Sequence, residues 1–111
     1  MNISVRGRHL AVSEGLKAYA VRRLTFSLGP FGSLVSRAEI RIADVNGPRG
    51  GVDKTSVITI VFRPIGTLVA RARHADAYSA IDRAAGRIRS VLVRSVQRRT
   101  RAGRGNRRQA R

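Results

Sequence analysis

Three successive segments between residues 35 and 73 have the patterns of β-strands. The outer two alternate in the manner of strands that bury one face, and the middle one carries the apolar run VITIVF. The first runs from Val35 to Val45, the second from Ser56 to Arg63, and the third from Thr67 to Arg73. Pro64 to Gly66 forms the predicted tight turn between the last two segments. Because a sheet with one apolar face must be covered, the remaining residues have to supply that cover.

Two amphipathic segments are available to cover this sheet. The first follows Ser13, a predicted N-cap, and ends by the Gly29–Pro30 pair because proline resists helical continuation. The second follows Asp76, another predicted N-cap. Residues 2–6, before the first helix, alternate like a fourth strand. The order β-α-β-β-β-α predicts an α+β fold in which two helices pack on one face of a four-stranded sheet. Double-stranded-RNA-binding modules have this general style, but a shared style of fold assigns no function.

The chain length of 111 residues fits one compact domain. We expect that domain to span residues 1–100, because the apolar spacing of the last helix is lost beyond about Arg101. Residues 101–111 are rich in arginine and glycine and are predicted to form a disordered basic tail. The sequence has no cysteine, which excludes disulfides, and no apolar run of the roughly 20 residues that span a bilayer. We therefore expect a cytoplasmic protein.

The balance of charge points to a polyanionic partner. Lysine and arginine total 23 against 6 acidic residues, a formal net charge of +17. A partner with dense negative charge relieves the resulting repulsion, and nucleic acid and an anionic membrane surface are the two candidates. The last helix has an apolar stripe that includes Ile81, Ile88 and Leu92, and a second stripe that is basic. The basic stripe consists of Arg83, Arg87, Arg94, Arg98 and Arg101.

Three stretches of the sequence carry a recognisable pattern. The N-terminal stretch MNISVRGRHLAVSEGLKAYAVRRL combines an opening strand with a helix start of the type V-T-E-A-L-K-x-Y. The stretch Asp76–Asp82 reads DAYSAID, and the middle stretch reads RIADVNGPRGGVDK. Over about residues 1–100, the chain resembles the short form of the bacterial ribosome hibernation-promoting factor and ribosome-associated inhibitor family, also called sigma-factor modulation proteins.

This resemblance implies a protein that does no chemistry. Members of the family bind the small ribosomal subunit in the decoding region, where they occupy the path of mRNA and of the A- and P-site tRNAs. The chain is therefore expected to bind 16S rRNA, to inhibit translation as a hibernation factor, and to be a monomer when free. Most of the predicted rRNA-binding residues match basic family positions, whereas Arg83 and Arg89 are included for their charge alone. The full set is Arg22, Arg23, Arg83, Arg87, Arg89, Arg94 and Arg98.

Other functions are compatible with the same charge. A general nucleic-acid-condensing protein would bind DNA and unrelated RNA through the same arginines. A membrane-surface protein would need the apolar face of the last helix, but the sheet requires that face and it has no aromatic anchor. A role in transcription, which the family's older name suggests, is neither supported nor excluded by these residues.

The sequence shows no pattern of catalysis or of cofactor binding. His9 and His74 are the only histidines, and they lack the neighbours of a metal site or a Ser-His-Asp triad. We therefore expect no enzyme, no metal, no cofactor and no small-molecule substrate. The glycine-rich segment at residues 46–55 has the wrong spacing for a phosphate-binding loop. We interpret it as a longer connection that brings Arg49 and Lys54 near phosphate.

The aromatic residues are predicted to serve mainly in packing. Tyr19 and Tyr78 lie near the apolar stripes, so packing in the core or between helix and sheet is favoured over base stacking. Phe26, Phe31 and Phe62 are interpreted as core or core-edge residues. Asp82 is predicted to pair with a nearby arginine.

Overall fold

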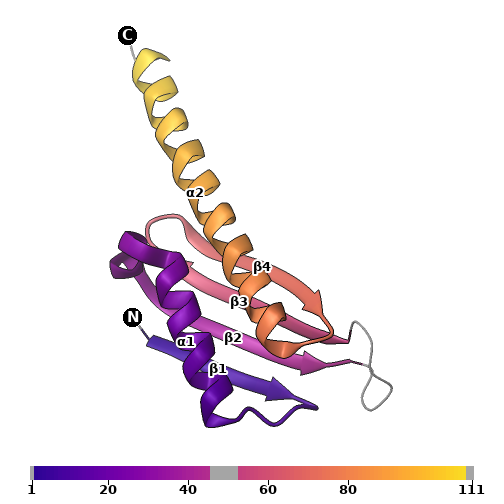
Figure 1. The fold of residues 1–111 in the computed structure, drawn as a ribbon. Helices are drawn as coiled ribbons and strands as arrows, with labels where there is room; N and C mark the ends of the chain where they lie inside the picture. The colour runs from indigo at the N-terminus through magenta and orange to yellow at the C-terminus, as the bar shows by residue number, and fades with distance from the viewer. Residues whose placement is uncertain (1, 46–52, 110–111) are drawn as a thin grey trace.

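The computed structural model describes residues 2–45 and 53–109, with side chains up to residue 100. Within these residues the chain forms four strands, two α-helices and a short 3-10 helix (Figure 1). In chain order the elements are β1 (Asn2–Arg8), α1 (Glu14–Leu28), the 3-10 helix η1 (Gly29–Leu34), β2 (Val35–Asp44), β3 (Lys54–Phe62), β4 (Gly66–His74) and α2 (Ala77–Gln109). The predicted order of strands and helices is confirmed, and the strand ends differ by one or two residues.

The strands form one mixed sheet in the order β1-β2-β3-β4. β1 runs parallel to β2, whereas β2 with β3 and β3 with β4 are antiparallel. The register places Ile40 between Val5 and Ile58, so apolar side chains line up across the strands on one face. Both α1 and α2 lie on that face (Figure 1), with α2 packed mainly on β4 and β3. The predicted arrangement of two helices on one face of the sheet is confirmed.

Local signals in the sequence set the ends of the helices. The Ser13 hydroxyl accepts a hydrogen bond from the Leu16 N–H at 3.1 Å, as predicted for an N-cap. At the start of α2, Asp76 accepts hydrogen bonds from the backbone and the hydroxyl of Ser79. The Ser79 hydroxyl contributes most to holding the pKa of Asp76 below its usual value. The C-cap of α1 is Gly29, whose φ of 52° combined with a ψ of −130° is readily adopted only by glycine.

The core lies between the sheet and the two helices, and it is mainly aliphatic. Its largest fully buried apolar side chains are Leu24, Leu28, Ile40, Ile42, Ile58, Ile60, Ile81, Ile88 and Leu92. Phe62 is also buried, and the partly buried Phe31 packs edge-on against it with 6.1 Å between the ring centroids. The predicted apolar stripes of both helices therefore face the sheet, and the predictions for Phe31 and Phe62 are confirmed.

Phe26 does not lie in the core, and the prediction for it is wrong. Its side chain is 80% exposed on the outer surface of α1. Each helical residue advances by about 100°, so Phe26 points roughly 160° away from both Leu24 and Leu28. Because Leu24 and Leu28 face the sheet, Phe26 faces outward.

α2 extends farther than the helix predicted from apolar spacing. Its backbone is helical to Gln109, which differs from the disordered tail predicted for residues 101–111. Figure 1 shows the C-terminal part of α2 running past the sheet. Because this part has no sheet to pack on, it needs no apolar stripe, and apolar spacing does not reveal it. The domain boundary at residue 101 stays a prediction. Residues 46–52 of the glycine-rich connection between β2 and β3 lie outside the described residues.

Candidate nucleic-acid interface

Arginines line one flank of α2, next to the edge strand β4. Arg83, Arg87 and Arg94 recur at intervals of four and seven residues, which places them on one side of the helix. The Arg87 Nη1 group donates a hydrogen bond to the backbone carbonyl of Arg71 in β4, so its guanidinium is held over the sheet edge. A guanidinium has five N–H donors, so this contact leaves others for a ligand. We define the α2 arginine row as Arg83, Arg87, Arg94 and Arg98.

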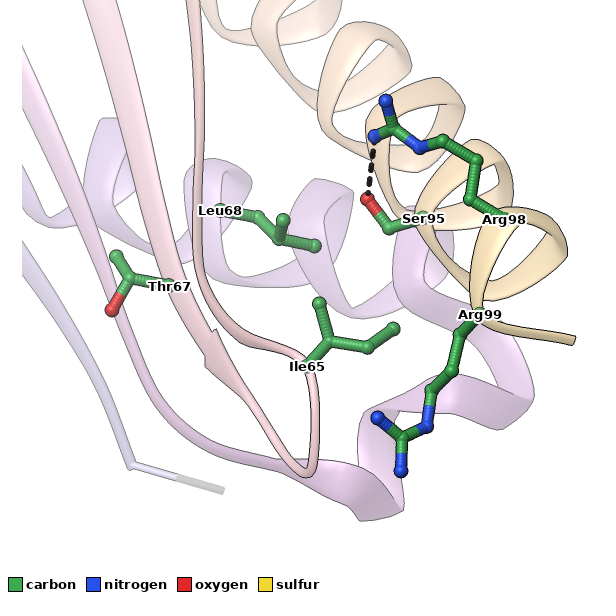
Figure 2. Close-up of a pocket in the computed structure, with 6 residues that line it drawn as sticks. All are labelled: Ile65, Thr67, Leu68, Ser95, Arg98 and Arg99. Atoms are coloured by element: carbon green, nitrogen blue, oxygen red, sulfur yellow. Dashed lines mark hydrogen bonds between the residues drawn. The ribbon is translucent and has the colours of Figure 1, made fainter. Parts of the chain in front are cut away.

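The C-terminal end of this row borders a shallow hollow between α2 and the turn after β3. Arg98 Nη2 lies 3.5 Å from the Ser95 hydroxyl, and Figure 2 shows its side chain folded back toward that residue. Arg99 extends away from Arg98 in the same view, because one residue turns a helix by about 100°. Ile65 and Leu68 supply apolar walls of the hollow. The row therefore includes Arg98 and leaves Arg99 outside.

Asp82 joins α2 to α1 and confirms the prediction that it pairs with an arginine. Its Oδ1 atom accepts hydrogen bonds from Arg23 Nε at 3.1 Å and from the Tyr19 hydroxyl at 2.5 Å. The hydrogen bond to Asp82 raises the pKa of Tyr19 above its ordinary value, and partial burial adds to the effect. The rings of Tyr19 and Tyr78 meet edge-on with their centroids 5.0 Å apart. Tyr19 therefore packs against the core beside α2, as predicted, whereas Tyr78 contacts it from α2 and stays 42% exposed.

Arg89 and Arg22, like Arg23, lie apart from the α2 arginine row. Arg89 points toward α1, where its Nη1 donates to the Ser27 carbonyl at 2.9 Å. Its guanidinium carbon also lies 6.0 Å from the centroid of the Phe31 ring, within reach of a cation–π contact. Arg22 is exposed on α1 and, among the described residues, makes no hydrogen bond or ion pair. The predicted set thus divides into the row, the pair Arg23 and Arg89 at the α1–α2 junction, and Arg22 alone.

A second basic surface, absent from the predicted set, lies on the sheet face opposite the helices. The register aligns Arg6, Arg41 and Arg71 across the sheet, with Val57 between the last two. Arg41 forms an ion pair with Glu39 on the same face. The alternation of β2 already indicated such a face, because the predicted element order leaves no helix to cover it. We define the open sheet face by its basic residues Arg6, Arg8, Arg37, Arg41, Arg71 and Arg73.

Lys54 is neutralised by two neighbouring carboxylates. Its Nζ atom lies 3.2 Å from Asp44 Oδ2 and 3.1 Å from Asp53 Oδ1. The hydrogen bond to Asp53 is the main cause of the raised pKa of Lys54. Because the Lys54 ammonium group already pairs with two carboxylates, it is poorly suited to bind a phosphate. Arg49, its predicted companion, lies outside the described residues.

The chemistry offered by these surfaces is the binding of anions. Guanidinium groups donate paired hydrogen bonds that match the geometry of phosphate oxygens. Within residues 2–45 and 53–109, no group of three or more His, Cys, Asp or Glu side chains is placed to hold a metal ion. No helix in the described part of the chain combines the length and the apolar character needed to cross a membrane.

Known proteins share both the sequence pattern and the fold of this chain. The family described as sigma 54 modulation protein / S30EA ribosomal protein matches residues 3–100. A ribosomal subunit interface protein from Coxiella burnetii is similar in structure, with a TM-score of 0.71 and 19% sequence identity over 85% of this chain and 96% of that chain. The N-terminal domain of Thermus thermophilus Protein Y is similar with a TM-score of 0.66 and 23% identity, over 85% and 98% of the two chains. No curated protein sequence matches the chain significantly.

Proposed function

The chain belongs to the sigma 54 modulation protein / S30EA ribosomal protein family, and from that membership we propose that it is a ribosome hibernation factor. It binds 16S rRNA of the small subunit near the decoding region, in the cytoplasm, and is a monomer when free. The α2 arginine row is the observation that carries this proposal. Asp82 is the one acidic residue of α2, and it pairs with Arg23 of α1, so no carboxylate of the helix is paired with the row. Like charges at helical spacing repel one another, and a bound polyanion removes that repulsion.

The proposed mechanism is occupancy without chemistry. Arg87, Arg94 and Arg98 bind rRNA phosphates, with Arg83 extending the row and Arg22 adding charge from α1. The folded body then excludes mRNA and tRNA from the space that it fills. Phosphate contacts fix position without reading sequence, so the shape of the rRNA surface selects the site.

Arg23 and Arg89 have a different part in this proposal. Both guanidiniums are already held by acceptors within the protein, namely Asp82 for Arg23 and the Ser27 carbonyl for Arg89. They therefore join α1 to α2 and offer only their remaining N–H groups to RNA.

Co-sedimentation with purified small subunits tests the proposal. The protein should move with the subunit at about 50 mM salt, and its affinity should fall by orders of magnitude by about 200 mM as phosphate contacts are lost. Addition of the protein to a translation extract should inhibit synthesis at the same low salt. A protein that stays at the top of the gradient at low salt contradicts the proposal.

A general nucleic-acid-condensing protein is the second candidate, because the open sheet face adds basic charge on the side opposite the helices. Such a protein would bind any polyanion through both faces. Competition separates the two candidates. Duplex DNA in excess by mass should leave a hibernation factor on the small subunit, whereas it should remove a condensing protein from it.

A further inference from the structure

The exposed ring of Phe26 lies at a hollow between α1 and α2. Isolated apolar residues on a protein surface are common and need no explanation. Phe26 differs because its ring is 80% exposed and also lines a hollow of about 390 Å3. The other residues that line this hollow are Arg23, Ser27, Gly86 and Arg89. An aromatic ring, two guanidiniums and an open space therefore meet at one place.

Gly86 keeps this hollow open on the α2 side. Glycine within a helix lowers helix stability relative to alanine, so its presence in the middle of α2 is unfavourable for the helix alone. A Cβ atom built at Gly86 would have no heavy atom within 4 Å. The helix therefore tolerates a side chain at this position, and the absence of one leaves space beside Phe26.

Ser27 holds both guanidiniums at the edge of the hollow. Its hydroxyl accepts from Arg23 Nη1 at 2.6 Å, and its backbone carbonyl accepts from Arg89 Nη1 at 2.9 Å. Asp82 fixes Arg23 further through the Nε atom. Each guanidinium has five N–H donors, so both retain donors for a ligand. Because the two side chains are already ordered, a ligand that binds them loses less conformational entropy.

We propose that this hollow binds one unpaired nucleobase of RNA, which stacks on the ring of Phe26 while Arg23 and Arg89 contact the adjacent phosphates. The proposal rests on the proposed function and specifies which feature of the RNA is bound at the α1–α2 junction. Base stacking on aromatic side chains is typical of single-stranded RNA recognition and tolerates any base. The large volume of the hollow suits a flat ring that enters beside Phe26 from the outer surface.

The charge around Phe26 favours RNA over a second copy of the chain. A dimer formed through Phe26 would bring Arg23 and Arg89 of both copies together, on proteins that each carry a net charge of +17. Repulsion opposes that association, whereas it favours a phosphate-bearing ligand.

The chain contains no tryptophan, so Phe26→Trp introduces a fluorophore that reports on this hollow alone. Oligoadenylate of about ten nucleotides should quench its emission on binding, because a stacked base contacts the indole. An abasic ribose-phosphate oligomer of equal length and charge should quench it much less. Val69→Trp, on the open sheet face, is the matched control and should show little quenching by either oligomer. Equal quenching by both oligomers, or equal quenching at both positions, overturns the proposal.

Two substitutions in the otherwise unchanged chain test the hollow by affinity. Phe26→Ala and Gly86→Met should each weaken oligoadenylate binding about tenfold, the first by removing the stacking surface and the second by filling the space. Gly86→Ala should bind like the parent protein, because it adds only a methyl group. Circular dichroism should show that all three retain the fold, since methionine and alanine both favour a helix over glycine. Parent-like binding by Gly86→Met or Phe26→Ala overturns the proposal, as does a dimer that Phe26→Ala dissociates.

Co-sedimentation with the small subunit distinguishes failure of this site from failure of the proposed function. If the parent and Phe26→Ala proteins sediment equally with the subunit and Phe26→Trp is not quenched by oligoadenylate, the hollow is not a base site and the proposed function stands. If the parent protein does not sediment with the subunit while quenching is observed, the base site stands and the proposed function fails.

Discussion

The helical side of the molecule and the open sheet face are both basic, yet they hold their arginines differently. On the helical side, Arg87 donates to a backbone carbonyl of β4, and Arg23 and Arg89 are fixed at Ser27. On the open sheet face, Arg6 and Arg37 make no hydrogen bond or ion pair among the described residues. These particular arginines differ in how far their side chains are ordered before any ligand binds, whereas Arg22 on α1 has no such partner among the described residues and Arg41 on the sheet is paired with Glu39.

The two faces also differ in their exposed aromatic side chains. The helical side combines an exposed aromatic ring with a hollow at the α1–α2 junction. The open sheet face has valines and threonines between its arginines, no aromatic side chain among its described residues, and Glu39 close to Arg41. Net charge attracts RNA to both faces, but an exposed aromatic ring beside ordered guanidiniums occurs on the helical side. This contrast teaches that charge alone does not identify the binding face.

The largest expected effect comes from removing charge from the α2 arginine row. Removal of the same charge from the open sheet face is its control. Arg87, Arg94 and Arg98 changed together to Gln should lower the affinity for the small subunit about 100-fold at about 100 mM salt, because three phosphate contacts are lost. The slope of log affinity against log salt should become less steep by about 2. Fluorescence anisotropy of the labelled protein, titrated with subunits at several salt concentrations, measures both quantities.

The matched control changes Arg6, Arg37 and Arg71 together to Gln on the open sheet face. Charges farther from the RNA than the Debye length, which is about 10 Å at about 100 mM salt, are largely screened, so this variant should lose less than about fivefold in affinity and keep the salt slope of the parent. Equal losses from the two triple variants would place RNA on both faces and favour the condensing protein.

A smaller effect is expected from Asp82→Asn, which tests whether the helical side is ordered before binding. The change removes the charged acceptor of Arg23 and Tyr19. Because the ion pair is partly exposed, the free energy of unfolding should fall by only about 1 kcal/mol, or roughly 4 °C in Tm, by thermal denaturation.

The same variant should change the titration of Tyr19. In the parent protein the folded pKa of Tyr19 lies above the ordinary tyrosine value, so this group's contribution to stability is complete below about pH 10 and is lost as the pH rises through the folded pKa. In Asp82→Asn the pKa of Tyr19 should fall toward the ordinary value. Ultraviolet titration of tyrosinate measures it, and an unchanged titration would show that Asp82 does not hold Tyr19.

The smallest effect is expected from Glu39→Gln on the open sheet face. The change frees Arg41 from its ion pair and raises the net charge of that face by one. Affinity for the small subunit should change by less than about twofold, since an exposed charge distant from the bound RNA is screened. An increase of tenfold in the same anisotropy assay would reveal that the open sheet face contacts RNA directly.

The sequence predicted those features that depend on local spacing. Alternation located the strands, side-chain caps located Ser13 and Asp76, and helical spacing identified the stripes that face the sheet. The prediction that Phe26 lies in the core failed because it rested on apolar character alone. The angle between Phe26 and Leu24 around the helix decides which side the ring occupies. Helical spacing left Arg89 out of the predicted basic stripe, but its hydrogen bond to the Ser27 carbonyl depends on the way α1 packs beside α2. The contact between Arg87 and β4 likewise depends on tertiary packing and not on spacing.

Directed hydroxyl-radical cleavage of 16S rRNA tests most directly the claim that the helical side binds RNA. The chain has no cysteine, so an iron chelate can be attached at a unique position, either by Ser90→Cys on α2 or by Thr59→Cys on the open sheet face. The chelate on α2 should cleave strongly in the decoding region, and the chelate on β3 should cleave weakly or elsewhere. Strong decoding-region cleavage from β3 with none from α2, or cleavage scattered over the rRNA from both, would contradict the assignment.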